Sequence, residues 1–149
     1  MEILIIIIGV ILDRITKLWA MTLKGKEGIV IIKNFFAFEY LENRGAAFGI
    51  FQGRIALLTI FTIVVLCIMG YLIYRYRKES KFMSVALSLI ISGAIGNLYD
   101  RVFYKYVVDF ILVHYKDVYY FPTFNVADIL VCVGTFLLCI AILKEGKNE

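Results

Sequence analysis

The sequence predicts a mainly α-helical membrane protein with four transmembrane helices and a small extracytoplasmic β-sheet. Hydrophobic residues make up 62% of its 149 residues, whereas soluble domains contain about 45–50%. They gather in four runs, each close to the roughly 20 residues that a helix needs to cross a bilayer. A single proline in the chain favours long, uninterrupted helices. No repeat or linker divides the sequence, so we expect one domain over residues 1–149.

The expected transmembrane helices follow the four apolar runs and cover residues 3–21, 55–74, 82–103 and 124–143. The first run has no basic start and no small-residue cleavage site after it, so we interpret it as a permanent helix and not as a signal peptide. The second run is almost free of polar groups and is expected to face lipid. Small residues recur every four positions in the third run, which favours close helix packing in a membrane. They are Ser84, Ser88, Ser92 and Gly96.

The segment 24–53, between the first two runs, is expected to form the small sheet at the membrane surface. Residues 29–32 and 35–40 are mostly β-branched or aromatic, and these residue types favour strands. Lys33 and Asn34 between them favour a turn. The other connections are expected to be short amphipathic loops, including the aromatic-rich segment 104–123.

Basic residues indicate the orientation in the membrane. The connection between the second and third runs holds Arg75, Arg77, Lys78 and Lys81, and such clusters mark the cytoplasmic side. The basic tail after the fourth run agrees with this. We therefore expect both termini in the cytoplasm and the predicted sheet outside. The net charge of +4 is spread along the chain and does not favour nucleic-acid binding.

Two aspartates, Asp109 and Asp128, are the candidate catalytic residues. They are expected at the outer ends of adjacent, antiparallel helices, where their carboxyl groups could meet. Two carboxyls at close range do not both ionise easily, so one keeps its proton while the other acts as a base. Such a pair can activate a water and protonate a leaving amide. No cofactor is expected, and with His114 as the only histidine a histidine-based metal site is not expected either.

Further polar side chains lie inside or beside the apolar runs, where burial is costly. Asp13 and Lys17 share one helix face in the first run, and Asn97, Asp100 and Arg101 end the third. These residues alone leave three interpretations open: a hydrolytic site, the helix-bridging groups of a structural membrane subunit, or the proton or ion path of a small transporter. The second run is apolar and the polar groups gather near one side, which disfavours a transporter.

Five short motifs occur in order along nearly the whole chain. They are Asp13-Arg14-Ile15-Thr16-Lys17, Asn43-Arg44-Gly45-Ala46-Ala47-Phe48, Gly96-Asn97-Leu98-Tyr99-Asp100-Arg101, Val107-Val108-Asp109-Phe110 and Phe124-Asn125-Val126-Ala127-Asp128. Together they resemble the lipoprotein signal peptidases, the type II signal peptidases of bacteria. The resemblance implies an aspartyl endopeptidase of the bacterial cytoplasmic (inner) membrane, with its active site toward the extracytoplasmic face. Its substrate would be a lipoprotein precursor, cleaved before a cysteine that already carries a diacylglyceryl group.

The resemblance also implies a role for each polar position. Asp109 and Asp128 match the family's catalytic dyad. The residues that line or support the substrate site would be Asn43, Gly45, Asn97, Arg101 and Asn125. The structural polar supports would be Asp13, Lys17 and Asp100.

The same resemblance implies the partners of the protein. These are the lipid-modified precursor, membrane lipid and globomycin-like cyclic peptide inhibitors. A monomer is expected because one chain holds a full site. One position departs from the family: Lys105 stands where members often have a glycine, so the turn that leaves the third run is expected to differ locally.

Overall fold

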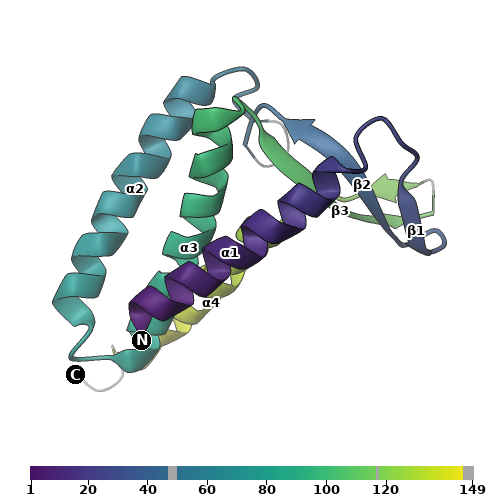
Figure 1. The fold of residues 1–149 in the computed structure, drawn as a ribbon. Helices are drawn as coiled ribbons and strands as arrows, with labels where there is room; N and C mark the ends of the chain where they lie inside the picture. The colour runs from purple at the N-terminus through teal and green to yellow at the C-terminus, as the bar shows by residue number, and fades with distance from the viewer. Residues whose placement is uncertain (47–49, 117, 146–149) are drawn as a thin grey trace.

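The structure, a computed structural model, describes residues 1–46, 50–116 and 118–145 (Figure 1). The helices lie together, and a sheet extends from the end of the bundle that lies opposite the N-terminus. In chain order the elements are α1 (Glu2–Met21), β1 (Ile29–Ile32), β2 (Phe36–Asn43), α2 (Ile55–Tyr76), α3 (Lys81–Phe103), β3 (Val107–Tyr115), β4 (Tyr119–Tyr120) and α4 (Val126–Glu145).

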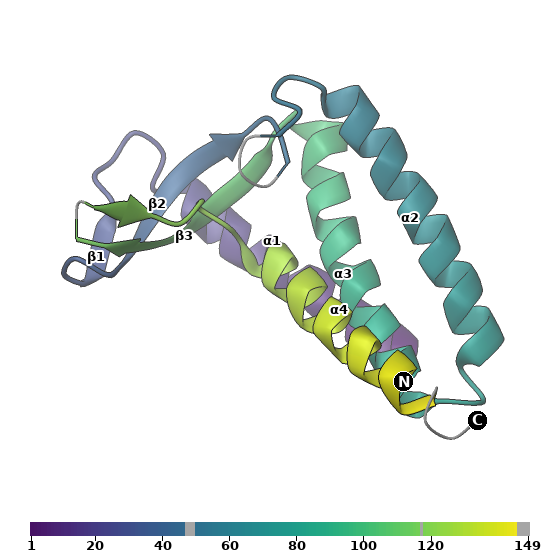
Figure 2. The same ribbon diagram turned by 180° about the vertical axis from the view of Figure 1, so that it is seen from behind.

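Helix α3 is the centre of the bundle, and α1, α2 and α4 all pack against it. The stripe of small residues predicted in the third run is buried: Ser84, Ser88 and Ser92 have no exposed surface. Small residues also bring α3 and α4 together, because an added Cβ at Gly93 would collide with the carbonyl oxygen of Ala127. Helix α2 stands apart from α1 and α4 in both views (Figures 1 and 2).

Three helices in the described part of the chain are long and apolar enough to cross a membrane, namely residues 55–76, 81–103 and 126–144. Helix α1 is 20 residues long, which corresponds to about 30 Å. Its length therefore matches a bilayer core, but Asp13, Arg14 and Lys17 interrupt its apolar sequence. Length and composition alone do not identify α1 as a fourth membrane-spanning helix.

The sheet has four antiparallel strands in the order β1-β2-β3-β4. Strands β1 and β2 form the expected hairpin, and Asn34 in its turn has a φ of 63°, a conformation that asparagine tolerates well. The interpretation of segment 104–123 as a loop was wrong, because β3 and β4 lie within it. Strand β3 is rich in β-branched and aromatic residues, and it pairs with β2 so that Asn43 lies opposite Val107.

Helix α4 begins at Val126, two residues later than the apolar run predicts. The side chain of Asn125 accounts for this start, because its Oδ1 accepts a hydrogen bond from the backbone N–H of Asp128 at 2.9 Å. A side-chain acceptor of this kind satisfies a backbone donor that the first helical turn leaves free. The helix start therefore places Asp128 in the first turn, directly beside the sheet.

Candidate active site

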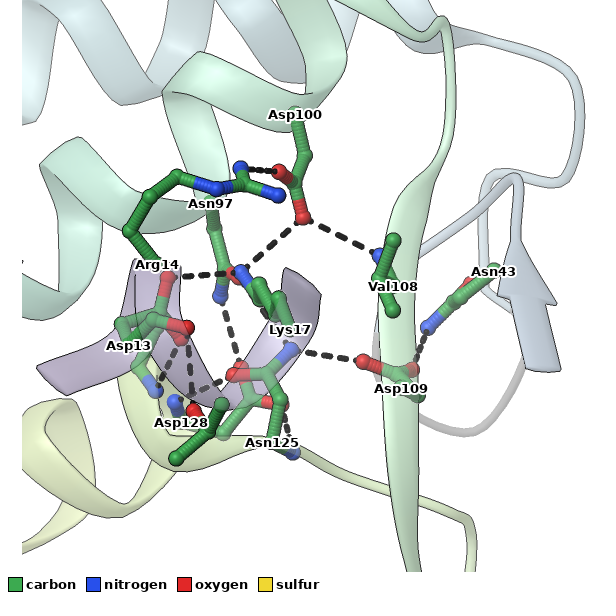
Figure 3. Close-up of polar contacts among 12 residues, drawn as sticks. Asp13, Arg14, Lys17, Asn43, Asn97, Asp100, Val108, Asp109, Asn125 and Asp128 are labelled. Carbon is green, nitrogen blue, oxygen red and sulfur yellow. Dashed lines mark hydrogen bonds and ion pairs between the residues drawn. The ribbon is translucent and has the colours of Figure 1, made fainter. Parts of the chain in front are cut away.

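Polar side chains from α1, β2, α3, β3 and α4 converge where the sheet meets the helices (Figure 3). Seen from behind, this junction lies at the end of the bundle away from the N-terminus (Figure 2). The residues come from all five motifs of the sequence. Ala47 and Phe48 of the second motif lie outside the described residues.

Asp109 lies on β3 and is 1% exposed. It was expected at the end of a transmembrane helix, but β3 begins four residues after α3 ends and carries it within the sheet. Its Oδ2 accepts a hydrogen bond from Asn43 Nδ2 at 2.9 Å, and its Oδ1 accepts one from Asn125 Nδ2 at 2.6 Å. Burial, and then the negative charge of Asp128, raise the pKa of Asp109 to about 7, while the two amide donors oppose this shift.

Asp128 lies in the first turn of α4. Its Oδ1 accepts a hydrogen bond from Asn97 Nδ2 at 2.8 Å, and its Oδ2 accepts one from the backbone N–H of Asn125 at 3.1 Å. Since the Asn125 side chain caps the N–H of Asp128 in return, the two residues form a reciprocal cap at the helix start. The spacing of Asn125 and Asp128 in the fifth motif is therefore the spacing that this cap requires.

Two asparagine side chains connect the carboxyl groups of Asp109 and Asp128. Asn125 Nδ2 donates to Asp109 and also lies 3.2 Å from Asn97 Oδ1, while Asn97 Nδ2 donates to Asp128. The structure thus joins the two predicted catalytic residues in one hydrogen-bond network. Within the described ranges, neither carboxyl group forms an ion pair with a lysine or arginine.

Gly45 acts on Asp109 through Asn43. Its backbone N–H donates to Asn43 Oδ1 at 2.9 Å, so the amide nitrogen of Asn43 is the group that faces Asp109. Gly45 is buried, and an added Cβ would lie 2.9 Å from the carbonyl oxygen of Ile50. The tight turn therefore requires a residue without a side chain at this position.

A cavity of about 990 Å³ opens beside the two aspartates. Asp109, Asp128, Asn43, Asn97 and Arg101 all line it. Its other walls are mostly apolar and come from the membrane-type helices, with Phe61 and Val65 on α2, Ile90 and Ala94 on α3, and Ile129 and Val131 on α4. The cleft can therefore accept an apolar segment beside a pair of carboxyl groups.

Arg101 lies in the cleft wall with its Nε buried and without a hydrogen-bond partner in the described part of the chain. Asp109 and Asp128 line the same cleft. Arg101 therefore brings a cation to the wall that holds the two aspartates.

A second cluster of charges lies behind the cleft and does not line it. Lys17 Nζ is 2.9 Å from Asp13 Oδ2 and 3.0 Å from Asp100 Oδ2, and all three side chains are 0–1% exposed. Gly96 makes room for this cluster, because an added Cβ there would collide with the carboxylate of Asp13. The predicted polar supports are therefore one buried ion-pair network.

Arg14 belongs to the same network and was not among the predicted site residues. Its Nη1 lies 2.6 Å from Asp100 Oδ1, and its guanidinium group sits 4.9 Å and 5.4 Å from the rings of Tyr99 and Tyr104. The sequence held a signal for this role, since Arg14 is a cation inside an apolar run. Its partner, however, lies 86 positions away along the chain.

The sequence matches the family model described as signal peptidase II over residues 5–144. A lipoprotein signal peptidase of Clostridium novyi (strain NT) is 64% identical over 148 residues, which are 99% of this chain and 100% of the relative. One from Staphylococcus aureus (strain MRSA252) is 38% identical over 99% of this chain and 91% of its own.

Solved structures of bacterial membrane enzymes are also similar. One, determined by the in meso method at 2.3 Å resolution, superposes with a TM-score of 0.84 at 36% identity, covering 99% of this chain and 90% of the other. Another, determined by the same method at 1.9 Å, gives a TM-score of 0.79 at 37% identity over 96% and 92% of the two chains. The likeness therefore extends through both the helices and the sheet.

Proposed function

Because this chain belongs to the signal peptidase II family, the lipoprotein signal peptidases that remove signal peptides from lipoprotein precursors, we propose that Asp109 and Asp128 are its catalytic pair. The supporting observation is their arrangement: both carboxyl groups line one cleft, share a network of amide donors and have no cation bound directly to them in the described ranges. A structural role in bridging helices gives no reason for such an arrangement.

In this proposal the two carboxyl groups hydrolyse a peptide bond with one proton between them. Asp109 carries that proton at the start, in line with the raised pKa of its buried carboxyl group. Asp128 is the base, because the first turn of a helix stabilises a negative charge. It removes a proton from a water that attacks the scissile carbonyl, while Asp109 protonates the carbonyl oxygen. The roles then reverse, and the leaving amide nitrogen receives a proton.

We further propose that the substrate is a precursor whose cysteine carries a diacylglyceryl group, cut just before that cysteine. The apolar walls from α2, α3 and α4 suit the hydrophobic signal peptide, and the acyl chains remain in the surrounding lipid. Arg101 and Asn43 at the cleft wall would contact the polar backbone near the scissile bond. A cyclic peptide inhibitor such as globomycin would compete for the same cleft. One chain holds all these groups, which supports a monomer.

The proposed topology has four membrane-spanning helices, with α1 as the fourth. The charges of α1 are compatible with burial, because Asp13, Arg14 and Lys17 all form ion pairs inside the bundle. The basic connection between α2 and α3 lies at the same end as the N-terminus (Figure 1), and this end would face the cytoplasm. The sheet and the cleft would face outward from the bacterial inner membrane.

The direct test is cleavage of a lipid-modified precursor by the purified protein in detergent. Asp109→Asn and Asp128→Asn keep the size and polarity of the side chain but cannot transfer a proton. Each is expected to lower kcat by at least about 1,000-fold, since general acid–base groups alone contribute roughly 10²–10⁴-fold.

Glu39→Gln is the matched control, because Glu39 is an exposed carboxylate on β2 outside the cleft. It should cleave at the wild-type rate. The proposal is wrong if either aspartate variant melts like the wild-type protein and still cleaves at the wild-type rate.

A further inference from the structure

We propose that Lys17 is a positioning residue for the peptidase reaction, and that its single buried ammonium group fixes both catalytic carboxyls in place. The inference rests on the proposed function and adds to it a residue that does not touch the substrate. Lys17 contacts three side chains, and each of these forms a hydrogen bond with Asp109 or Asp128, or with the residue directly before one of them.

The ammonium group of Lys17 forms one hydrogen bond, to Asn97, and two ion pairs, with Asp13 and Asp100, all inside the protein. A lysine has three N–H donors and no acceptor. Lys17 Nζ lies 2.9 Å from Asp13 Oδ2, 3.0 Å from Asp100 Oδ2 and 2.9 Å from Asn97 Oδ1. Its side chain has no exposed surface. One nitrogen atom from α1 thus sets the distances among three groups on α1 and α3.

Two of these groups hold the backbone directly before the proposed catalytic residues. Asp13 Oδ1 accepts a hydrogen bond from the N–H of Ala127 at 2.9 Å, and Ala127 directly precedes Asp128. Asp100 Oδ2 accepts one from the N–H of Val108 at 3.1 Å, and Val108 directly precedes Asp109 (Figure 3). Each carboxylate that pairs with Lys17 therefore anchors the peptide one residue before a catalytic residue, on a helix in one case and on a strand in the other.

The third group determines which end of an amide faces Asp128. An asparagine amide can turn over and exchange its oxygen and nitrogen. Because Asn97 Oδ1 faces the Lys17 ammonium, Asn97 Nδ2 faces Asp128 Oδ1 at 2.8 Å. The opposite orientation would place an amide oxygen against a carboxylate oxygen. Asn97 Oδ1 also accepts from Asn125, which donates to Asp109. Through Asn97, Lys17 is therefore connected to both carboxyl groups.

The chain allows this positioning role to be separated from simple charge balance. Asp13, Arg14, Lys17 and Asp100 hold two positive and two negative charges. Lys17→Met leaves one buried negative charge without a partner. The double variant Asp13→Asn/Lys17→Met restores the balance, because Arg14 still pairs with Asp100 and the new asparagine side chain can still accept the N–H of Ala127. It lacks the ammonium group that orients Asn97 and links Asp13, Asn97 and Asp100, while the charge balance and an acceptor for Ala127 are retained.

The experiment measures kcat, KM and the melting temperature with a lipid-modified precursor in detergent. For the double variant we expect a melting temperature near that of the wild type. We expect kcat to fall by about 100-fold, the effect of a displacement near 1 Å at a reacting group, and KM to change by less than about threefold, because no substrate contact is lost.

Leu87→Ala is the control for lost stability, since Leu87 is fully buried on α3 in a separate apolar cluster. It should lower the melting temperature while the folded enzyme keeps its kcat. Lys17→Arg provides a second variant with the charge retained. A guanidinium cannot present three donors from one atom, so kcat should fall here too.

The inference is overturned if the double variant, or Lys17→Arg, cleaves at the wild-type rate. Inactive Asp109→Asn and Asp128→Asn proteins alongside that result would leave the proposed function standing and remove only the role of Lys17. Active aspartate variants would instead refute the proposed function itself.

Discussion

Four aspartates lie near one another in this protein, in two pairs with different partners. Asp13 and Asp100 face cations, with Lys17 between them and Arg14 at 2.6 Å from Asp100. Asp109 and Asp128 face amide groups of asparagine side chains and of the backbone. All four side chains accept hydrogen bonds, and all but the partly buried Asp128 are fully buried. The two pairs therefore differ mainly in the charge of their partners.

The comparison shows how the same side chain can serve structure or chemistry. A cation compensates the charge of a buried carboxylate, and the paired group then serves as an anchor. Neutral amides hold a carboxyl in place but leave most of its charge uncompensated. Asp109 accordingly has a pKa raised to about 7 by burial and by Asp128, and it can bind or release a proton near neutral pH.

The largest expected difference between the pairs is in stability. Asp100→Asn removes the negative charge between Lys17 and Arg14, and breaking a buried ion pair costs roughly 3–5 kcal/mol. Asp109→Asn removes a carboxyl group that pairs with no cation, at the cost of one hydrogen bond, so the free energy of unfolding should change by less than about 1.5 kcal/mol. Reversible unfolding in mixed micelles measures both. Equal losses would mean that Asp109 is as structural as Asp100.

A smaller effect is expected on the pH dependence of catalysis. Asp109 must hold a proton in the proposed mechanism, so kcat should fall as pH rises through about 7. Asn43 Nδ2 favours the ionised form of Asp109, and its removal in Asn43→Ala should raise the pKa of Asp109 further. The falling limb should then move to higher pH by about one unit, which corresponds to about 1.4 kcal/mol.

Arg44→Ala is the neighbouring control for this pH profile. Arg44 is exposed and pairs with Glu42 on the strand surface, where solvent screens the charge, so the limb should not move. If the falling limb of the pH profile moved to lower pH in Asn43→Ala, the hydrogen bond from Asn43 would not favour the ionised form of Asp109.

The smallest effect is expected in the turn that joins the cation-paired Asp100 to the amide-held Asp109. Lys105 in this turn has a φ of 64°, in the left-handed region that glycine adopts without strain. Lys105→Gly should stabilise the protein by at most about 1 kcal/mol, because the gain in the turn is partly offset by greater chain entropy when unfolded.

Melting temperatures in detergent can test this turn, with Lys105→Val as the matched variant. Valine is β-branched and strongly disfavours positive φ, so its variant should melt below the wild type and the glycine variant above it. The reverse order would show that the conformation of Lys105 is not a source of strain. Cleavage should be unaffected in the glycine variant.

The sequence predicted the helices well because membrane-length apolar runs have few alternatives. It also predicted the β1–β2 hairpin from β-branched and aromatic residues around Asn34. The sheet was underestimated, although Val107–Tyr115 carries the same residue types, because two flanking helices made a loop the simpler interpretation. Strand β3 needs β2 as a partner, and this pairing joins residues that are far apart in the sequence, from Asn43 with Val107 to Phe36 with Val113.

The candidate site was predictable in its members but not in its connections. The motifs supplied Asp109, Asp128 and the asparagines, yet nothing local to Asp13 indicates that it binds the N–H of Ala127, 114 positions away. Such contacts depend on the rotation of α1 against α3 and α4, which small residues such as Gly96 permit. Arg14 was missed for the same reason, since its partner is fixed by helix packing.

The reciprocal cap at the start of α4 determines which inactive variant, Asp109→Asn or Asp128→Asn, is better suited to bind an uncleaved precursor for structure determination. Asp128 accepts the N–H of Asn125, and its other oxygen faces Asn97, which Lys17 prevents from turning over. An asparagine there would have one acceptor oxygen for these two N–H donors, so its own Nδ2 would face one of them. An asparagine in place of Asp109 could keep its oxygen toward Asn125 and turn its Nδ2 toward Asn43, a partly exposed residue at the end of a strand that can move aside. Asp109→Asn is therefore the better substrate trap, because it removes proton transfer and keeps the helix start intact.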